Sequence, residues 1–415
     1  MRFLLCPVGS SGDVHPYIGI GRELQARGHE VLLFGAEVHH EVATRNGLTF
    51  ISTASADDYH AATRDPDLWH PRKGFETVLQ LVIPHLERSR QVLEDHCLPG
   101  RTFIVGHPLS FAARVLEDQR GIPAATIHLA PSSLRTAYEV PTLPPDLDIR
   151  GWPLWLKRLL WVVIDRFMID PRIAPDLNRW RATLGLPPVR RVFKEWLNAP
   201  RRVIGLFPEW FGARQPDWPA SFTHASFPLW DDPTEAHIDP ELDAFLGRGQ
   251  PPVVVTPGSA NRHARPFFEA AAAALQQLGG RGLFLTGYPE QIPAGLPETI
   301  LHRGYAPFSL VLPRASALVS HGGIGTVAQG LAAGVPQLVM AMGFDQPDNA
   351  MRLSRLGVGR MLTPKRFTAG RVTTQLGELL EGEAHTHRAA EWRARLAEVN
   401  GIRLACDILE RDAGA

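Results

Sequence analysis

Short apolar runs and longer helical patterns alternate along two stretches of this chain, and this alternation restricts its fold more than any other feature. In the first stretch, residues 3–8 and 31–35 are apolar, and between them lie a Gly/Ser-rich turn at 9–12 and a helical pattern closed by Gly28. A strand, a helix and a second strand in this order form the βαβ unit of a parallel sheet. The alternation continues to about residue 130 and predicts a doubly wound α/β domain.

The alternation restarts after a polar segment and predicts a second Rossmann-like domain. We expect a first domain at 1–231, a linker at 232–250, a second domain at 251–385, and a C-terminal helix at 386–415 that packs back towards the first domain. Two such domains facing each other across a cleft provide the usual place for a ligand. The expected strands of the second domain are 253–256, 282–286, 317–320, 337–341 and 358–361.

Charge and cysteine content argue against several classes of function. Lys+Arg and Asp+Glu both number 43, so the formal net charge is +0 and no long-range field attracts nucleic acid or an anionic bilayer. The three cysteines, Cys6, Cys97 and Cys406, match neither a disulfide framework nor a zinc-binding spacing. The start does not resemble a signal peptide, and no apolar stretch reaches about 18 residues. We expect a reduced, cytoplasmic protein that binds no nucleic acid.

The segment 320–326, Ser-His-Gly-Gly-Ile-Gly-Thr, carries the strongest functional signal. It follows an apolar strand pattern and opens a helical one, so its free N–H groups and the positive end of the helix favour a phosphate or diphosphate. His321 and Thr326 can add side-chain donors. Glycine-rich turns also occur where a strand and a helix pack closely, and this structural explanation stays open.

Three other strand-end loops carry small or polar residues. They are Pro-Gly-Ser at 257–259, Tyr-Ala-Pro at 305–307, and the loop that contains Asp345 and Gln346. Because the carboxyl ends of parallel strands meet at one edge of a sheet, we expect these loops to converge with His321. A carboxylate and an amide in this position are suited to the hydroxyl groups of a sugar.

These motifs resemble those of a known family. Residues 321–326 together with 345–350 resemble the nucleotide-sugar signature of family one glycosyltransferases, which have the GT-B fold, and residues 9–16 resemble their N-terminal motif. The resemblance covers nearly the whole chain. It is closer to the bacterial rhamnosyltransferases of rhamnolipid synthesis, which join dTDP-L-rhamnose to a hydroxyalkanoyloxyalkanoate. This closer similarity is carried by residues 65–71, 206–211, 217–219 and 284–287.

The resemblance implies that the first domain binds the acceptor and the second binds the nucleotide-sugar donor. The 321–326 loop and Ser259 would hold the diphosphate. The backbone at 305–306 would hold the base, and residues 345–346 the sugar. No metal or cofactor is implied, because the helix end and His321 would supply the positive charge and the nucleotide sugar is a substrate. The implied donor site comprises Ser259, Tyr305, Ala306, His321, Gly322, Gly323, Gly325, Thr326, Asp345 and Gln346.

The resemblance also assigns the catalytic base to Asp13. This residue lies three positions before Pro16, where many relatives carry a catalytic histidine and others an aspartate. It would accept the proton of the acceptor hydroxyl as that oxygen attacks the anomeric carbon with inversion. An N-cap of the first helix would suit the same position, and the two roles can coexist.

Gln329 stands where plant members of the family carry a glutamate that grips both ribose hydroxyls. A weaker grip on the ribose favours a dTDP-sugar over a UDP-sugar as the donor. The tryptophan on which the base stacks in plant members is replaced here by Tyr305 or Ala306, which leaves base stacking open.

A helical pattern at 154–170 is apolar over most of its circumference. So wide an apolar face must be buried in protein, in a ligand or at a bilayer surface. A core helix is the simplest explanation. The alternative is a pocket for the tail of a lipidic acceptor, which would be contacted by Trp155, Leu160 and Trp161. The polar residues of the helix form one narrow stripe: Lys157, Arg158, Asp165 and Arg166.

The function predicted from these observations is an inverting, metal-independent transfer of L-rhamnose from dTDP-L-rhamnose to a hydroxyl of a lipidic acceptor such as a hydroxyalkanoyloxyalkanoate. One alternative is a glucosyl or deoxysugar transferase acting on a sterol, carotenoid or polyketide aglycone. Another is a sugar-nucleotide epimerase or hydrolase on the same fold. A partner enzyme that supplies the acceptor and weak peripheral contact with the inner membrane fit the main prediction.

Two further polar groups carry weaker signals. Asp146-Leu-Asp148 has the spacing of a metal-binding motif, but it lies in a proline-rich loop of the first domain, far along the chain from the 321–326 loop. His39 and His40 are interpreted as a surface pair.

Overall fold

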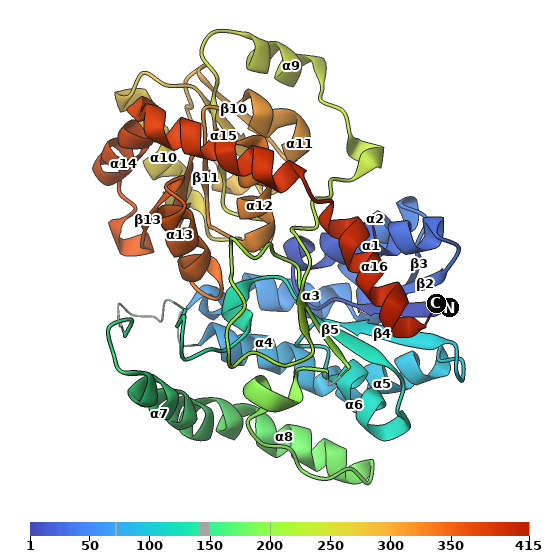
Figure 1. Ribbon diagram of the computed structural model, residues 1–415. Coiled ribbons are helices and arrows are strands. Elements are labelled where there is room, and N and C mark those ends of the chain that lie inside the picture. Colours follow the sequence, from blue (N-terminus) through green and yellow to red (C-terminus); the bar gives the residue numbers. More distant parts are fainter. Residues whose placement is uncertain (71–72, 142–148, 200, 415) are drawn as a thin grey trace. The chain divides into compact units, whose positions relative to one another are not determined.

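The computed structural model describes residues 1–70, 73–141, 149–199 and 201–414. The chain divides into two compact units (Figure 1). Unit 1 comprises Met1–Gly9, Asp13–Pro228 and Asn400–Ala415, and unit 2 comprises Ser10–Gly12 and Leu229–Val399. Each unit contains its own parallel sheet.

The sheet of unit 1 has seven strands in the order β3-β2-β1-β4-β5-β6-β7, and each neighbouring pair is parallel. The strand order reverses direction between β1 and β4, where Cys6 pairs with Gly106. The strands are β1 (Arg2–Cys6), β2 (Glu30–Ala36), β3 (Thr49–Ala54), β4 (Thr102–Gly106), β5 (Ala124–His128), β6 (Arg202–Gly205) and β7 (Phe222–His224).

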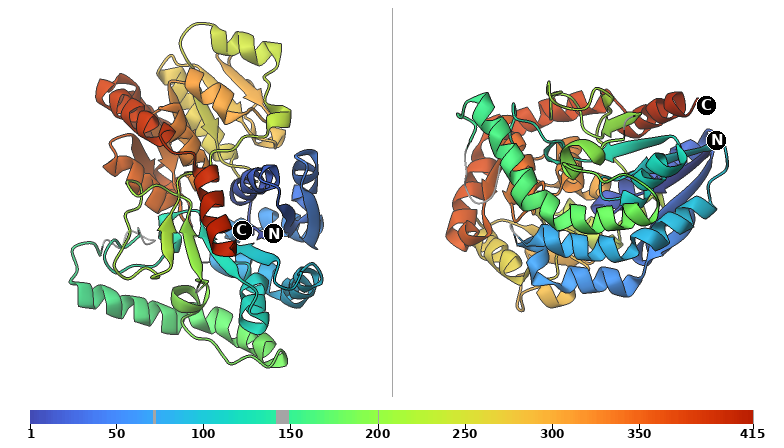
Figure 2. Two further views of the ribbon diagram at one scale, coloured as in Figure 1. Left: turned by 45° about the vertical axis from the view of Figure 1, so that its right-hand side comes forward. Right: turned by 90° about the horizontal axis from the view of Figure 1, so that it is seen from below.

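Helices connect these strands, and a π-helical turn at Asp165–Ile169 joins α7 to α8. Figure 2 shows α7 and α8 following each other as one long helical segment of unit 1. The α-helices of this unit are α1 (Ser11–Ala26), α2 (His40–Arg45), α3 (Ala56–Arg64), α4 (Gly74–Val82), α5 (Leu86–Asp95), α6 (Phe111–Arg120), α7 (Leu154–Ile164), α8 (Asp170–Thr183) and α16 (Gly401–Ala413).

The sheet of unit 2 has six parallel strands in the order β10-β9-β8-β11-β12-β13, and its order reverses between β8 and β11. Both units are therefore Rossmann-like, as predicted. The strands are β8 (Val253–Thr256), β9 (Gly282–Leu285), β10 (Ile300–Arg303), β11 (Ala317–Ser320), β12 (Gln337–Met340) and β13 (Gly359–Leu362). The helices are α9 (Pro240–Gly247), α10 (Arg265–Gln277), α11 (Phe308–Val311), α12 (Ile324–Ala333), α13 (Gln346–Arg355), α14 (Ala369–Glu381) and α15 (Glu383–Ala397).

Strands β8, β9, β11 and β12 of unit 2 are buried at every position because helices cover both faces of the sheet. Val253 and Val255 belong to the core that includes residues of α10 and α14, whereas Val254 belongs to a second core that includes residues of α9 and α11. Successive side chains of a strand point to opposite faces, so a strand buried on both sides is mostly apolar.

The structure divides the chain differently from the expected boundaries. The segment expected as a linker lies inside unit 2, where Leu242, Phe245 and Leu246 of α9 pack into the core. The expected C-terminal helix is two helices, because the chain leaves α15 and starts α16 at Asn400. The Asn400 side chain accepts a hydrogen bond from the backbone N–H of Arg403 and so caps α16.

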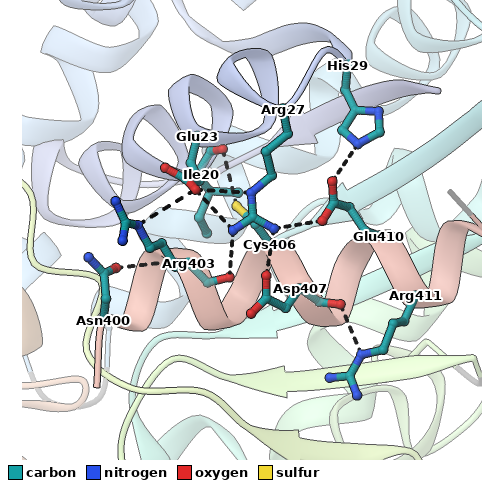
Figure 3. A network of polar contacts seen from close by, with 10 residues as sticks. All are labelled: Ile20, Glu23, Arg27, His29, Asn400, Arg403, Cys406, Asp407, Glu410 and Arg411. Carbon is teal, nitrogen blue, oxygen red and sulfur yellow. Dashed lines mark hydrogen bonds and ion pairs between the residues drawn. The ribbon is translucent and has the colours of Figure 1, made fainter. Parts of the chain in front are cut away.

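Helix α16 is held to unit 1 by a network of polar contacts around Arg27 (Figure 3). The Arg27 guanidinium contacts Asp407 at 2.6 Å and Glu410 at 2.7 Å, and Glu410 also contacts His29 Nε2 at 2.7 Å. Burial opposes ionisation of Glu410, but hydrogen bonds from His29 and Arg27 outweigh it and lower the pKa of this carboxyl. The network therefore depends on the charged side-chain carboxylate of Glu410 in α16.

None of the helices that the structure describes combines the length and the apolar character needed to cross a membrane. Cys6, Cys97 and Cys406 are free thiols. Burial raises the pKa of Cys97 to about 11 and that of Cys406 to about 12, so both are thiols near neutral pH.

Candidate functional site

The candidate site of unit 2 lies where the strand order reverses. Ser320 at the end of β11 pairs with Thr256 at the end of β8. The loops that follow, 257–259 and 321–323, therefore leave the sheet side by side. In open α/β sheets, this is the position of the crevice that binds ligands.

The imidazole of His321 lies between two glycine backbones. A Cβ atom at Gly258 would be 2.6 Å from His321 Cε1, and one at Gly323 would be 2.5 Å from His321 Nε2. Gly258 also has a φ of +86°, which disfavours other residues. These short distances explain why glycine stands at both positions, because the imidazole ring lies too close to the two loops for any side chain.

The loop between β11 and α12 is fixed by its own hydrogen bonds. Ser320 Oγ accepts from Gly322 N at 3.1 Å, and the Gly322 carbonyl accepts from Asn349 Nδ2 at 3.0 Å. A Cβ atom at Gly322 would be 2.4 Å from a methyl carbon of Val339, and its φ is +87°. The contact between Asn349 and Gly322 joins the loop to α13, and the sequence alone did not predict it.

Helix α12 presents its N-terminus to this loop. Gly323 is the N-cap and supplies no side-chain acceptor, and the half-buried Gly325 and Thr326 lie in the first turn. The exposed N–H groups and the positive end of the helix are suited to an anion. Burial lowers the pKa of His321 to about 4. A neutral imidazole cannot supply the positive charge that we expected of it, whereas the N-terminus of α12 can.

Residues 345–346 differ in what their side chains can do. Gln346 is buried, and its Oε1 accepts from the backbone N–H groups of Met342 at 2.8 Å and Gly343 at 3.3 Å. This side-chain oxygen braces the loop and is not available to a sugar hydroxyl. Asp345 is half-buried and accepts from Asn349 Nδ2 at 2.7 Å. Sugar binding by Asp345 stays a prediction.

The residue before Asp345 carries backbone strain. Phe344 has a φ of +55°, in the left-handed region that bulky residues rarely adopt, and its ring is exposed. Strained residues persist where the surrounding structure holds them, and they concentrate at ligand sites. The strained Phe344 directly precedes Asp345, which accepts a hydrogen bond from Asn349. Asn349 also donates to Gly322 in the 321–326 loop.

The remaining predicted donor residues lie at the ends of β8 and β10. Ser259 is exposed, and its carbonyl accepts from the Tyr288 hydroxyl at 3.3 Å. The Arg262 guanidinium lies 4.5 Å from the centre of the Tyr288 ring, which places a cation near this loop. The sequence analysis did not single out Arg262. Tyr305 is exposed and Ala306 is buried, directly before α11.

Gln329 contacts a carboxylate of the last residue of the expected first domain. Its Nε2 donates to Asp231 Oδ1 at 3.2 Å, and Asp231 Oδ2 accepts from the backbone N–H of Ser309 at 2.7 Å. A polar residue at an expected domain boundary gives no sequence signal for such a role. The ribose-gripping carboxylate of the plant enzymes is therefore not reproduced by Gln329 itself.

In unit 1, Asp13 lies in the first turn of α1, after the loop that leaves β1. Its carboxyl group packs against Gly9, where a Cβ atom would be 2.2 Å from Asp13 Oδ2. His39 Nε2 hydrogen-bonds the Gly9 carbonyl at 3.3 Å from a buried position, and burial lowers its pKa. The interpretation of His39 as a surface residue is wrong, because it supports the loop beside Asp13.

Two more histidines, which the sequence analysis did not single out, lie at strand ends of unit 1. His107 follows β4, and His128 ends β5 and hydrogen-bonds Ser133 Oγ at 2.8 Å and Asn198 Oδ1 at 2.9 Å. Burial lowers the pKa of His107 to about 3 and that of His128 to about 4. Both rings are neutral near pH 7. A histidine directly after an apolar run was the signal that could have found them.

The three predicted acceptor residues lie on α7 and differ in exposure. Trp155 is 66% exposed, Leu160 is half-buried, and Trp161 Nε1 donates to the Thr136 carbonyl at 2.8 Å. The apolar face of α7 is exposed, and Lys157 is buried instead. The expectation of a core helix is therefore wrong, and the tail pocket stays a prediction.

Metal binding was tested on the described residues. Within residues 1–70, 73–141, 149–199 and 201–414, no three His, Cys, Asp or Glu side chains lie together in an arrangement that could hold a metal ion. Asp146 and Asp148 lie outside the described residues.

Comparisons with known proteins support a class for this chain. Residues 289–400 match the family model of the erythromycin biosynthesis protein CIII-like C-terminal domain. The chain is 28% identical over 440 residues to O-mycaminosyltylonolide 6-deoxyallosyltransferase of Streptomyces fradiae, covering 99% of this chain and 97% of that protein. It is 28% identical over 407 residues to glycosyltransferase GtfE of Amycolatopsis orientalis, covering 97% and 93%.

Solved structures show the same architecture. The glycotransferase of kitacinnamycin matches with a TM-score of 0.76 at 24% identity, covering 99% of both chains. Spinosyn rhamnosyltransferase SpnG matches with a TM-score of 0.70 at 18% identity, covering 99% and 100%. SsfS6 of Streptomyces sp. SF2575, in complex with thymidine diphosphate, matches with a TM-score of 0.63 at 19% identity, covering 99% of both chains. The predicted GT-B fold is confirmed, and the comparisons together support a glycosyltransferase.

Proposed function

We propose that this protein transfers a deoxysugar from a dTDP-sugar to a hydroxyl group of an aglycone, with inversion and without a metal ion. The observation that carries the proposal is the cradle at the end of β8 and β11. There His321 is wedged between Gly258 and Gly323, and the N-terminus of α12 opens onto the same loop. A diphosphate has the charge and the number of acceptor oxygens that suit such a cradle.

The donor would lie along the strand ends of unit 2. Its diphosphate would accept hydrogen bonds from the first turn of α12 and from His321, its sugar would bind Asp345, and its base would contact the backbone at 305–306. Thymidine as the base is supported by two observations. Gln329 is hydrogen-bonded to Asp231 and offers no carboxylate to a ribose 2′-hydroxyl. SsfS6, which shares the fold, has been solved with thymidine diphosphate.

The relatives favour an aglycone over a lipid as the acceptor. The Streptomyces fradiae relative is named as a deoxyallosyltransferase of O-mycaminosyltylonolide, and SpnG is named as a spinosyn rhamnosyltransferase. The local support for a lipid acceptor was the apolar helix at 154–170, and its face is exposed rather than folded around a pocket. L-Rhamnose remains the first deoxysugar to test, and hydroxyalkanoyloxyalkanoate becomes the second acceptor class.

In the proposed reaction, Asp13 accepts the proton of the acceptor hydroxyl as that oxygen bonds to the anomeric carbon. The bond from this carbon to the diphosphate oxygen breaks on the opposite face, and the diphosphate leaves with the electron pair. General-base assistance of this kind contributes about 10²–10⁴-fold. The positive end of α12 stabilises the charge that develops on the departing diphosphate.

A panel assay tests the proposal. The protein is incubated with dTDP-L-rhamnose, dTDP-glucose or UDP-glucose and with macrolide aglycones, sterols or hydroxy fatty acids, and products are identified by mass spectrometry. We expect a glycosylated aglycone from a dTDP-deoxysugar, in the presence of EDTA as well as in its absence. Release of dTDP at the same rate without any acceptor would instead support the hydrolase or epimerase alternative. Loss of turnover with EDTA, restored by magnesium, would contradict the metal-independent step.

A further inference from the structure

Helix α7 and the π-helical turn after it present a continuous apolar surface to solvent. Residues spaced by three or four positions lie on one side of a helix, so these side chains form one stripe. The segment lies in unit 1 and can be followed in Figure 2. We call this surface the α7 face; its large exposed apolar side chains are Trp155, Leu159, Val162, Val163, Phe167 and Met168.

The inward side of the helix fixes this orientation. Asp165 is 2% exposed and forms an ion pair with Arg135, whose guanidinium lies 5.0 Å from the centre of the Trp161 ring. Trp161 in turn donates to the Thr136 carbonyl, and Lys157 is also buried. Rotating the helix to hide the α7 face would break a buried ion pair and expose its partners, which is strongly unfavourable. Lys157 and Asp165 therefore anchor the helix, and the apolar stripe is left outside.

The charges beside the α7 face have one sign. Within the segment 154–172, all of which is described, the exposed charged side chains are Arg158, Arg166 and Arg172. The two acids of the segment are used elsewhere. Asp165 is in the buried ion pair, and Asp170 accepts hydrogen bonds from the backbone N–H groups at 191 and 192.

We propose that the α7 face binds the surface of an anionic lipid bilayer, with the helix lying in the plane of the interface. The aromatic and aliphatic side chains would enter the boundary between headgroups and acyl chains, and the arginines would contact lipid phosphates. A second copy of the chain suits this surface less well, because it would bring two sets of arginines together. The formal net charge of the chain is +0, so the attraction is local to this helix.

This inference goes beyond the proposed function and does not depend on it. An enzyme held at a bilayer by α7 would meet apolar acceptors where they dissolve. Binding is measured on the full chain without substrates, so loss of binding and loss of glycosyl transfer are separate results.

Vesicle flotation tests the proposal. The full-length protein is mixed with vesicles of phosphatidylcholine alone or with 30% phosphatidylglycerol, and the bound fraction is followed against lipid concentration (about 0.01–1 mM). We expect binding to the anionic vesicles at least about tenfold tighter than to the neutral ones, and weaker in high salt. Replacing Trp155 and Phe167 together by serine should weaken binding by about tenfold or more. The matched control is Val399→Ser, which alters an exposed apolar residue of unit 2.

A second variant protects the test against a folding artefact. Val162→Gln with Val163→Gln changes two exposed side chains of the α7 face, and its melting temperature reports whether the fold is intact. Equal flotation of wild type and a folded variant would overturn the proposal, as would no flotation up to 1 mM anionic lipid. A dimer in vesicle-free light scattering that the same substitutions dissociate would assign the α7 face to a second copy and overturn the lipid proposal as well.

Discussion

At the scale of single residues, the donor cradle of unit 2 depends on contacts that admit no side chain. His321 touches the backbone of Gly258 on one side and of Gly323 on the other. The ring is neutral near pH 7, because burial lowers its pKa to about 4. The two glycines therefore leave room for the imidazole ring in this position, and the contribution of the ring does not depend on a positive charge.

We expect Gly323→Ala to damage donor use while leaving the fold intact. The new Cβ atom would overlap His321 Nε2 and displace the ring by a fraction of an ångström or more. Misplacement on this scale can lower kcat/KM by about 10²-fold. The measurement is kcat/KM for the donor, together with dTDP binding by calorimetry. Gly287→Ala is the control, because a Cβ atom there meets nothing within 4 Å. Equal loss in both variants would show that the His321 contact is not responsible.

Asp13 is the second residue with a testable role. Asp13→Asn keeps the shape of the side chain but removes its ability to accept a proton, so kcat should fall by about 10²–10⁴-fold while dTDP binding is unchanged. Asp57→Asn is the matched control, because Asp57 is also an acid in the first turn of a helix. If Asp13 serves mainly to stabilise α1, its substitution would lower the melting temperature and leave most of the activity.

At the scale of elements, α16 is attached to unit 1 by charge as well as by packing. Glu410 connects Arg27 and His29, and its pKa is lowered in the folded protein. A carboxyl group with a lowered folded pKa stabilises the fold above its unfolded pKa, and this contribution is lost as the pH falls through the folded pKa. Attachment of α16 should therefore weaken in acid.

The expected result is a pH-dependent loss of hydrogen-exchange protection in α16. Between pH 6 and pH 3.5, after correction for intrinsic exchange, the protection of α16 should fall by an amount equivalent to about 1 kcal/mol in the wild type. Glu410→Gln should already lack this protection at pH 6 and should change less with pH. Glu398→Gln, an exposed acid before α16, serves as the control. Identical pH profiles for wild type and Glu410→Gln would refute the role of this carboxylate.

Element positions could be predicted where burial alone decides the residue pattern. Four strands of unit 2, β8, β9, β11 and β12, are buried at every position because both faces of the sheet are covered, and the sequence analysis located them together with β13. Strand β10 lies at the edge of the sheet, is buried only at Ile300, and was not predicted. Likewise β6 and β7 complete the sheet of unit 1 beyond residue 130, where the expected alternation had stopped.

Other features could not be predicted because contacts distant in the sequence set them. The direction that α7 faces follows from the ion pair between Arg135 and Asp165, which periodicity cannot reveal. Asp231 was expected to end the first domain, yet it lies in unit 2 and contacts Gln329. His39 appeared to be a surface residue, yet it supports Gly9 beside Asp13. The glycine-rich loop, by contrast, was predictable because its residues are consecutive.

At the scale of the whole molecule, the two units have separate sheets and separate cores, and the proposed donor groups all belong to unit 2. A ligand that binds only the folded form of one unit stabilises that unit by RT ln(1 + [L]/Kd), which is about 2.7 kcal/mol at 100 times Kd. The donor nucleotide should therefore stabilise unit 2 more than unit 1.

We expect dTDP to slow hydrogen exchange in unit 2 at the loops after β8, β11 and β12, in the peptides covering 257–261, 321–333 and 341–349. The sheet of unit 1, sampled at β3 and β5, should exchange as it does without nucleotide. UDP at the same concentration should protect the same peptides less, because Gln329 is bound to Asp231 and offers no carboxylate to the ribose 2′-hydroxyl. Protection centred on β3 and β5 would move the donor site to unit 1. Stronger protection by UDP would reverse the assignment of the base, while leaving the cradle around His321 in place.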